Sequence, residues 1–288
     1  MTAAPPAFFR RSANAAPNEA IEPMPTIITS TANPRVKDAV GLRDARRRRR
    51  QGRILIDGAR ELRRAIEAGL SLREVFVFAP WCTSEDARAV LDRLPGAGAE
   101  RVDVTQPVFE RLAFGRRSDG VLAVADMPRR ALDQLELPDE PLVAVLEGVE
   151  KPGNLGAVVR SADAAGWSAV IAADARTDLY NPNAIRASLG TVFTMPLAAA
   201  PAAEVLHWLR ARGLAIAAAR VDGAMAHTEF DFRRPAALVL GSEAGGLSPQ
   251  WRSADITPLR LPMLGAADSL NVSAAAAVFF YEARRQRG

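Results

Sequence analysis

The chain has 288 residues, 49% of them apolar, and this length suffices for two domains with a sizeable core. Its formal net charge is only +4, but its arginines are unevenly spread. No apolar run reaches the roughly 18 residues that a membrane-spanning helix needs, which argues against an integral membrane protein. A single cysteine, Cys82, excludes an internal disulfide and a cysteine-cluster metal site, and it fits a reducing, cytoplasmic compartment.

Histidine usage argues against a metal centre. His207 and His227 are the two histidines, and they are too few and too far apart to indicate a zinc site or a histidine-based catalytic triad. We therefore expect no bound metal. The many alanines and arginines are typical of a GC-rich genome, so the number of arginines is by itself a weak indicator of nucleic-acid binding.

Residues 1–25 contain several prolines and alanines and lack a long apolar stretch, so they do not indicate a secretory signal. A transit peptide is an alternative, against which the acidic residues Glu19 and Glu22 argue. We expect a disordered tail.

Residues 26–127 predict a small α/β domain, because short apolar strands alternate with amphipathic helices. Asn33 is a candidate N-cap, and the helix that it begins is expected to continue into an arginine run at 46–50. Further helices are expected at 59–68, 84–94 and 106–112, and strands at 54–58, 74–78, 102–104 and 121–125.

The arginine run consists of Arg46, Arg47, Arg48, Arg49 and Arg50. Adjacent guanidinium groups repel one another, and phosphates offset that repulsion. We therefore expect these five side chains to contact nucleic acid, with a plain basic surface as the alternative. The domain carries no motif that distinguishes RNA from DNA.

Residues 128–141 hold three prolines and an acidic stretch, and we place a linker and the domain boundary there. Residues 142–288 predict a second α/β domain, which opens with a buried strand of the parallel type at 142–147. Asn154 is expected to cap a helix that ends near Ala165. Beyond it we expect strands at 168–172, 191–195, 214–219 and 237–240, and helices at 181–189 and 201–212.

The C-terminal stretch joins an apolar strand, which ends at Pro262, to an alanine-rich helix through a polar loop. Ser269 and Asn271 stand where this helix begins, and such side chains cap helices by accepting backbone N–H bonds. Four consecutive alanines at 274–277 allow another backbone to approach the helix closely. A capped core helix with no functional role is the alternative interpretation.

Polar loops around Asn154, Glu243 and Ser269 follow three of the expected strands. Open α/β sheets bind ligands at the ends of their strands, so these loops are candidates for one site. The glycines after the strand at 142–147 lack the G-x-G-x-x-G spacing of a dinucleotide site, and no GK[ST] triplet marks a phosphate-binding loop. A nucleotide-dependent enzyme is therefore disfavoured.

Together these loops resemble the three motifs of the SpoU/TrmH branch of the SPOUT RNA methyltransferases. The residues that carry the resemblance are Asn154 with Arg160, the segment 241–245 with Glu243, and the segments 261–263 and 269–273. The resemblance covers residues 142–286. Residues 33–125 are similar, more loosely, to the ribosomal-protein-like RNA-binding domain that many members carry.

The resemblance implies a chemistry and a topology. Family members methylate a ribose 2′-hydroxyl in structured RNA with S-adenosylmethionine, and they act as homodimers whose knotted regions pack together. The catalytic domain is expected to be an α/β domain with a deep trefoil knot, a feature that is very rare in proteins. The knot would comprise the strands that end near Leu240 and Leu261 and the helix after Asn271.

The resemblance also implies roles for five catalytic residues. It places Arg160 nearest the reacting hydroxyl; because a guanidinium stays charged, we expect it to bind the target phosphate and stabilise the forming oxyanion rather than to act as the base. Asn154 would orient Arg160 or the ribose, and Ser269 and Asn271 would complete a polar floor. Glu243 would hold the loops or the arginine, or would merely satisfy buried backbone N–H groups.

For the methyl donor, the resemblance implies contacts largely through backbone groups. The expected cofactor residues are Leu240, Gly241, Leu261, Met263 and Leu270. Leu240, Leu261 and Met263 would supply an apolar slot for the purine ring.

Two alternatives within this fold stay open. One is a non-enzymatic RNA-binding assembly factor, and the other is an enzyme that acts on transfer RNA. The separate N-terminal domain favours ribosomal RNA over transfer RNA. The target nucleotide depends on how two domains present one loop of RNA, and the sequence does not encode it legibly.

Overall fold

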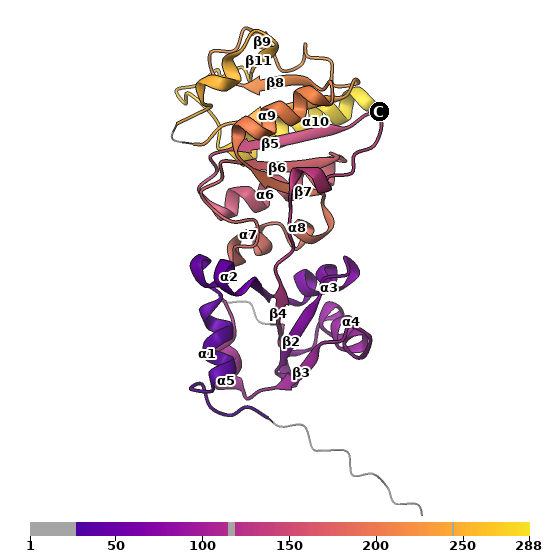
Figure 1. Cartoon of the computed structure of the whole chain (residues 1–288), viewed down its shortest axis with the longest axis vertical. Helices are drawn as coiled ribbons and strands as arrows, with labels where there is room; N and C mark the ends of the chain where they lie inside the picture. The colour runs from indigo at the N-terminus through magenta and orange to yellow at the C-terminus, as the bar shows by residue number, and fades with distance from the viewer. Residues whose placement is uncertain (1–26, 115–118, 244) are drawn as a thin grey trace, which may run out of the picture.

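An N-terminal and a C-terminal β-sheet lie one above the other along the long axis of the chain (Figure 1). The computed structural model describes residues 27–114, 119–243 and 245–288. The tail expected at residues 1–25 lies outside the described residues. The α/β class predicted from the sequence is confirmed for both parts of the chain.

The N-terminal sheet has four strands in the order β1-β4-β2-β3. These strands are β1 (Arg53–Asp57), β2 (Leu72–Val77), β3 (Glu100–Asp103) and β4 (Val121–Asp126). Strands β2 and β3 are parallel, whereas β4 runs antiparallel to both β1 and β2. The helices are α1 (Pro34–Gly41), α2 (Ala45–Gln51), α3 (Ala59–Glu67), α4 (Glu85–Arg93) and α5 (Gln106–Leu112), with 3-10 turns at Ala79–Trp81 and Leu94–Gly96.

Helices α1 and α5 cover one face of this sheet, and α3 and α4 cover the other (Figure 1). Val36 of α1 and Phe109 of α5 are buried in the same apolar cluster as Phe76 of β2. The preceding residue of β2, Val75, joins Leu62 of α3 in the other cluster. Neighbouring residues of one strand thus point to opposite faces, as the two-residue period of a strand requires.

The single helix expected from Asn33 to the arginine run is wrong, because the chain breaks between α1 and α2. Asp44 begins a new helix by accepting a bond from the backbone N–H of Arg47 at 3.0 Å. The break frees the carbonyl groups of Leu42 and Arg43, and the guanidinium of Arg48 donates to both at 2.8 Å. One arginine of the run therefore stabilises the end of α1.

The C-terminal sheet has seven strands, all parallel, in the order β7-β6-β5-β10-β8-β11-β9. These strands are β5 (Leu142–Glu147), β6 (Ala169–Ala173), β7 (Leu197–Ala200), β8 (Ala215–Ala219), β9 (Met225–Ala226), β10 (Ala236–Leu240) and β11 (Ile256–Arg260). The helices are α6 (Pro152–Ala165), α7 (Pro182–Ala187), α8 (Thr191–Thr194), α9 (Ala202–Ala211) and α10 (Val272–Arg287), with 3-10 turns at Leu132–Gln134 and Pro249–Arg252.

Helices α6 and α10 cover one face of this sheet, and α9 covers the other. Strand β5 is buried over its whole length, with Leu146 in the cluster under α6 and α10 and Val145 in the cluster under α9. A parallel strand that is covered on both faces has to be apolar throughout, which explains the continuous apolar run at 142–147.

Two local predictions in this part are wrong. The strand expected at 191–195 is the short helix α8, followed by strand β7, which the sequence analysis missed. Its β-branched and aromatic residues favour a strand, but the hydroxyl of Thr191 donates to the carbonyl of Ser188 at 2.9 Å and fixes a tight turn. The helix expected to start at Asn154 begins earlier, with Lys151 as N-cap and Pro152 in the first helical position, which proline favours.

Several strands of the C-terminal sheet that are consecutive in sequence are not neighbours in the sheet. Strand β10 lies between β5 and β8, and β11 lies beyond β8. After β11 the chain returns to α10, which packs against α6. The trefoil knot implied by the resemblance stays a prediction.

Helices α2 and α3 of the N-terminal part face α7 and α8 of the C-terminal part (Figure 1). Arg48 of α2 crosses this boundary and forms an ion pair with Asp178, with 2.5 Å between Nη2 and Oδ2. The side chain of Arg48 is fully buried. The expectation that Arg48 contacts nucleic acid is therefore wrong, because its guanidinium already caps α1 and joins the two parts of the chain.

A second ion pair joins the two parts between β1 and α7. Arg186 lies 3.0 Å from Asp57, whose carboxylate also accepts a bond from the backbone N–H of Phe114. Burial raises the pKa of Asp57 to about 6, although the nearby Arg186 charge opposes the shift. Arg64 of α3 adds a bond of 2.7 Å to the carbonyl of Leu189. The two sheets are thus held by polar contacts as well as by apolar packing.

Replacing Arg48 with alanine is expected to lower the free energy of unfolding by about 3 kcal/mol, because it leaves the Asp178 carboxylate and two carbonyl groups without their partner. Urea denaturation followed by circular dichroism measures the change. Arg46→Ala is the matched control: Arg46 is exposed, so a change within about 0.5 kcal/mol is expected. Equal stabilities for the two variants would contradict a structural role for Arg48.

Candidate functional site at the carboxyl ends of the strands

A cavity of about 570 Å³ opens at the carboxyl ends of β8, β10 and β11. It is lined by the segment that follows each of these strands and by the first turns of α10. The carboxyl ends of parallel strands meet at one edge of a sheet, and ligands of open α/β sheets bind there. The cavity therefore lies at the edge where the sequence pattern predicted a site.

Nine of the ten residues predicted for catalysis and cofactor binding come together here. Eight line the cavity: Leu240, Gly241, Glu243, Leu261, Met263, Ser269, Leu270 and Asn271. Asn154 lines an adjoining cavity of about 260 Å³, which shares Glu243 with the first. Arg160 lines neither cavity. The functional roles assigned to these residues stay predictions.

The carboxylate of Glu243 joins three segments of the chain. Its Oε1 accepts bonds from the side-chain amides of Asn154 and Asn271, the latter at 2.9 Å. Its Oε2 forms an ion pair with the ammonium group of Lys151. Both oxygens are thus held by groups at the starts of α6 and α10, which favours a loop-holding role for Glu243 over satisfaction of backbone N–H groups. Asn154 contacts Glu243 rather than Arg160.

Asn271 caps helix α10, as the sequence predicted. Its Oδ1 accepts bonds from the backbone N–H and the hydroxyl of Ser273, at 3.0 and 2.6 Å. The same side chain donates its amide to Glu243, so one residue both begins the helix and fixes the loop after β10. Ser269 is exposed at the cavity wall and forms no side-chain hydrogen bond with the described residues.

The loop after β10 turns back on itself at Gly241. Ser242 and Gly246 form an isolated antiparallel bridge with backbone bonds of 3.2 and 3.0 Å. A Cβ atom at position 241 would collide with the backbone of Gly246 and lie 2.6 Å from the nitrogen of Leu247. Position 241 therefore requires glycine, because only a residue without a side chain permits this close approach.

Glu147, at the end of β5, fixes the far end of the same loop, and the sequence analysis missed this role. Its Oε2 accepts the backbone N–H of Ser248 at 2.7 Å, and its Oε1 accepts the Ser248 hydroxyl at 2.6 Å and the Gln250 amide at 3.2 Å. Glu147 is only 6% exposed. A carboxylate that ends an otherwise apolar strand is the sequence signal that marks such a residue.

Charged residues of the cavity rim were also missed. Arg220 and Asp222 follow β8 and form an ion pair of 2.6 Å. The hydrogen bond from Arg220 lowers the pKa of Asp222. Lys151 and Arg252 add positive charge to the same rim. Ion pairs between residues far from any recognisable motif leave no sequence signal.

Arg160 lies apart from this network. It is exposed on α6, and its side chain forms no hydrogen bond or ion pair with the described residues. Of the arginine run, Arg46, Arg47, Arg49 and Arg50 are likewise exposed and remain candidates for nucleic-acid contact.

The described residues hold no cluster of three or more histidine, cysteine, aspartate or glutamate side chains that could bind a metal. In the same part of the chain, no helix is both long enough and apolar enough to cross a membrane.

Residues 141–281 match the SpoU rRNA Methylase family, and residues 33–123 match the MRM3-like substrate binding domain. The chain is 32% identical over 250 residues to the 23S rRNA (uridine(2479)-2′-O)-methyltransferase of Streptomyces viridochromogenes, covering 84% of this chain and 85% of that protein. The chain belongs to the SpoU rRNA methylase family. The family membership predicted from the three loops is thereby confirmed.

Solved structures of RNA methyltransferases have the same fold. A structure described as an RNA 2′-O ribose methyltransferase is 40% identical and superposes with a TM-score of 0.80, over 91% of this chain and 99% of that one. The SpoU methyltransferase AviRb from Streptomyces viridochromogenes, solved with the cofactor AdoMet, is 30% identical with a TM-score of 0.80, over 88% and 98% of the chains.

Replacing Glu147 with glutamine is expected to loosen the loop after β10, because an amide cannot accept all three bonds that the carboxylate accepts. Hydrogen exchange of the Ser248 amide should accelerate by roughly tenfold. This factor corresponds to the loss of one hydrogen bond to a charged group, which makes local opening easier. Mass spectrometry of amide exchange checks this. Glu150→Gln is the control, since Glu150 is exposed and, within the described part of the chain, pairs with Arg176. Unchanged exchange at Ser248 would refute the role of Glu147.

Proposed function

We propose that this chain transfers a methyl group from S-adenosylmethionine to a ribose 2′-hydroxyl of ribosomal RNA in the cytoplasm. The observation that carries the proposal is the cavity at the ends of β8, β10 and β11, whose walls Glu243 fastens together. The names of the SpoU relatives favour ribosomal RNA over transfer RNA. Residues 26–127 would bind the RNA, residues 128–141 would link the domains, and residues 142–288 would form the catalytic domain, whose knot is part of this proposal.

The lining of the cavity fits this methyl donor. Leu240, Leu261 and Met263 offer an apolar slot for a purine ring, and Leu270 extends the apolar wall. The backbone at Gly241 and at the strand ends offers hydrogen-bond partners for the edges of the ring. When bound, S-adenosylmethionine supplies a methyl group on a positively charged sulfur. The residues of the chain then have to position the ribose that accepts this group.

A ribose hydroxyl is a poor nucleophile because its pKa lies far above neutrality, so alignment with the methyl group is the main requirement. The amides of Asn154 and Asn271, which Glu243 holds in place, and the exposed hydroxyl of Ser269 provide a polar floor for the ribose. Glu243 acts as a positioning residue, because the Lys151 charge and both amides already occupy its oxygens. The hydroxyl proton would pass to a phosphate oxygen or to water.

Arg160 suits the binding of the target phosphate and stabilisation of the forming oxyanion. Its guanidinium stays charged, and its exposure on α6 leaves it accessible to RNA. Within one chain, Arg160 lies outside the cavity at the ends of β8, β10 and β11, which we call the donor cavity. RNA that reaches both the cavity and α6, or a second copy of the chain packed beside α6, would bring Arg160 to the reacting groups.

We propose that the second copy packs on α10, which lies against α6. Ala274, Val278 and Tyr281 form an exposed apolar stripe along this helix, with Val278 42% and Tyr281 55% exposed. Residues spaced by three or four positions share one helix face. Burying such a stripe in a homodimer removes it from water.

Incubation of the purified protein with tritiated S-adenosylmethionine and deproteinised ribosomal RNA is expected to label a ribose 2′-oxygen. Arg160→Ala should lower kcat by about 100-fold without changing donor affinity, because it removes charge stabilisation of the forming oxyanion and Arg160 lies outside the donor cavity. Arg160→Lys, which keeps the charge but loses the planar fork, should give an intermediate rate. Calorimetry with the donor provides the affinity control.

Other results of this experiment would favour the alternatives. Donor binding without label on ribosomal RNA would favour transfer RNA as the substrate. Absence of donor binding would favour an RNA-binding assembly factor. A pH–rate limb that persists in Arg160→Ala would exclude Arg160 as the general base.

The double variant Val278→Arg/Tyr281→Arg is expected to be a monomer, because two buried positive charges on each copy would oppose association across the stripe. Sedimentation velocity on the wild type and the variant measures the change. Arg88→Ala, which alters an exposed residue on α4 of the N-terminal part, should leave the dimer intact. A monomeric wild type would refute the proposed dimer.

A further inference from the structure

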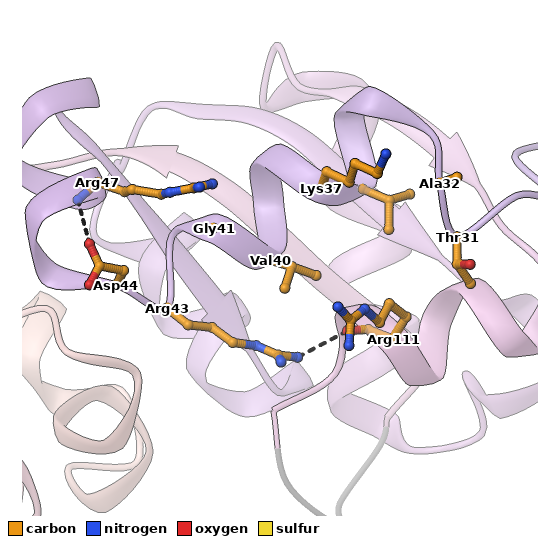
Figure 2. A pocket seen from close by; sticks show the side chains of 10 residues that line it. Thr31, Ala32, Lys37, Val40, Gly41, Arg43, Asp44, Arg47 and Arg111 are labelled. Carbon is orange, nitrogen blue, oxygen red and sulfur yellow. Dashed lines mark hydrogen bonds between the residues drawn. The ribbon is translucent and has the colours of Figure 1, made fainter.

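A second cavity, of about 800 Å³, lies in the N-terminal domain on the side of α1 and α5. Figure 2 shows its lining, which comes from the start of α1, the corner between α1 and α2, and the end of α5. None of its residues lines the donor cavity. We call it the α1–α5 groove and define it by Lys37, Val40, Arg43, Arg47 and Arg111.

The α1–α5 groove carries four cationic side chains and one carboxylate, Asp44. The side chain of Asp44 caps α2 by accepting the backbone N–H of Arg47 (Figure 2). Lys37, Arg47 and Arg111 are exposed, and none of them pairs with a carboxylate among the described residues. By contrast, Arg35 at the start of α1 is neutralised by Glu74 and Glu100. The positive charge at the groove therefore lacks a protein partner in the described structure.

Arg43 has a structural task within the groove. Its Nη2 donates to the carbonyl groups of Arg111, Leu112 and Ala113. These hydrogen bonds hold the end of α5 against the corner after α1. Burial lowers the pKa of Arg43; the charge of Asp57 opposes this shift, and the smaller effect of the Arg111 charge adds to it. Arg43 and Arg111 line the same groove, and an anion bound between the helices would lie close to both guanidinium groups.

The shape of the groove is also suited to a ligand. Val36 is buried beneath it and Val40 is half-buried, so its floor is aliphatic while its rim is charged. The side chain of Arg47 extends across Gly41 (Figure 2), where a Cβ atom would collide with the guanidinium. An apolar floor beneath basic side chains matches an unpaired nucleotide, whose base or ribose contacts the floor while its phosphates contact the rim. A duplex keeps its bases stacked and paired, and would not fill such a floor.

We propose that the α1–α5 groove binds the sugar–phosphate backbone of a single-stranded segment of the substrate RNA, away from the ribose that is methylated. The proposal rests on the function proposed above, since it identifies where that RNA is held. Lys37, Arg47 and Arg111 contact the phosphates, and Val40 contacts a ribose or base. The groove contributes to affinity and to the choice of RNA, and not to the transfer step, because it is separate from the donor cavity.

The test compares the wild type with Arg47→Gln/Arg111→Gln by fluorescence anisotropy with labelled decauridylate. Each lost phosphate contact with a single strand lowers the steepness of log Kd against log salt by about 0.7, so the double variant should lose about 1.4. The same relation predicts a Kd about 25-fold weaker near 0.1 M salt. Arg47→Lys/Arg111→Lys, which keeps both charges, should restore most of the salt dependence.

Arg88 and Arg93 on α4 provide the matched control, because they lie on the opposite face of the sheet and are exposed. Arg88→Gln/Arg93→Gln removes the same charge and should change Kd by less than twofold. A wild type that does not bind decauridylate, an unchanged Kd in the groove variant, or equal losses in both double variants would overturn the proposal.

Activity measurements separate this proposal from the proposed function. With ribosomal RNA and tritiated donor, the groove variant should show a raised KM for RNA and an unchanged kcat, while donor affinity stays the same. A wild type that binds decauridylate through the groove but transfers no methyl group would refute the methyltransferase and leave the RNA site standing. A methyltransferase whose groove variant has an unchanged KM and unchanged decauridylate binding would refute the groove alone.

Discussion

The site depends on one carboxylate, that of Glu243, which accepts from Asn154 and Asn271 and pairs with Lys151. These partners belong to segments more than 100 residues apart in sequence, at the starts of α6 and α10. The loop after β10 closes on them because Gly241 lets its two arms approach, and Glu147 holds the far end of the same loop. Two carboxylates thus fix the loop that forms one wall of the cavity, whose lining combines apolar side chains with a charged and polar rim.

Charged side chains that also bind backbone groups join the two sheets as well. Arg48 and Arg186 reach across the boundary to Asp178 and Asp57, and each pair also involves backbone groups freed by a break or a loop. Removing one partner from such a buried network costs more than the pair contributes, since an unpaired charge remains. The N-terminal domain is therefore held against α7, the helix next to α6 at the site. These contacts between the two parts fit the proposed presentation of one nucleotide of RNA to the cavity.

Much of the architecture could be predicted because it depends on local patterns. The apolar run at 142–147 is a strand buried on both faces, and the loop residues at the strand ends meet at one edge, as parallel sheets require. The prediction failed where tertiary contacts override local preference: β-branched residues at 191–195 form a helix because the turn at Ser188 and packing against the core fix them. The helix break before Asp44 is a different case, because the Asp44 side chain that begins α2 makes a local contact, which the sequence analysis overlooked.

The sequence by itself determined the α/β class, the family and nine residues that meet at the site, since helix caps and strand ends are local features. Only the tertiary structure decided which charged side chains are buried and paired with other residues of the chain. Arg48 and Arg47 are neighbours in one run of identical residues, yet the first is buried against Asp178 and the second lies open in the α1–α5 groove. A run of charges specifies electrostatic potential, whereas burial and partners depend on segments that are distant in sequence and adjacent only in the fold.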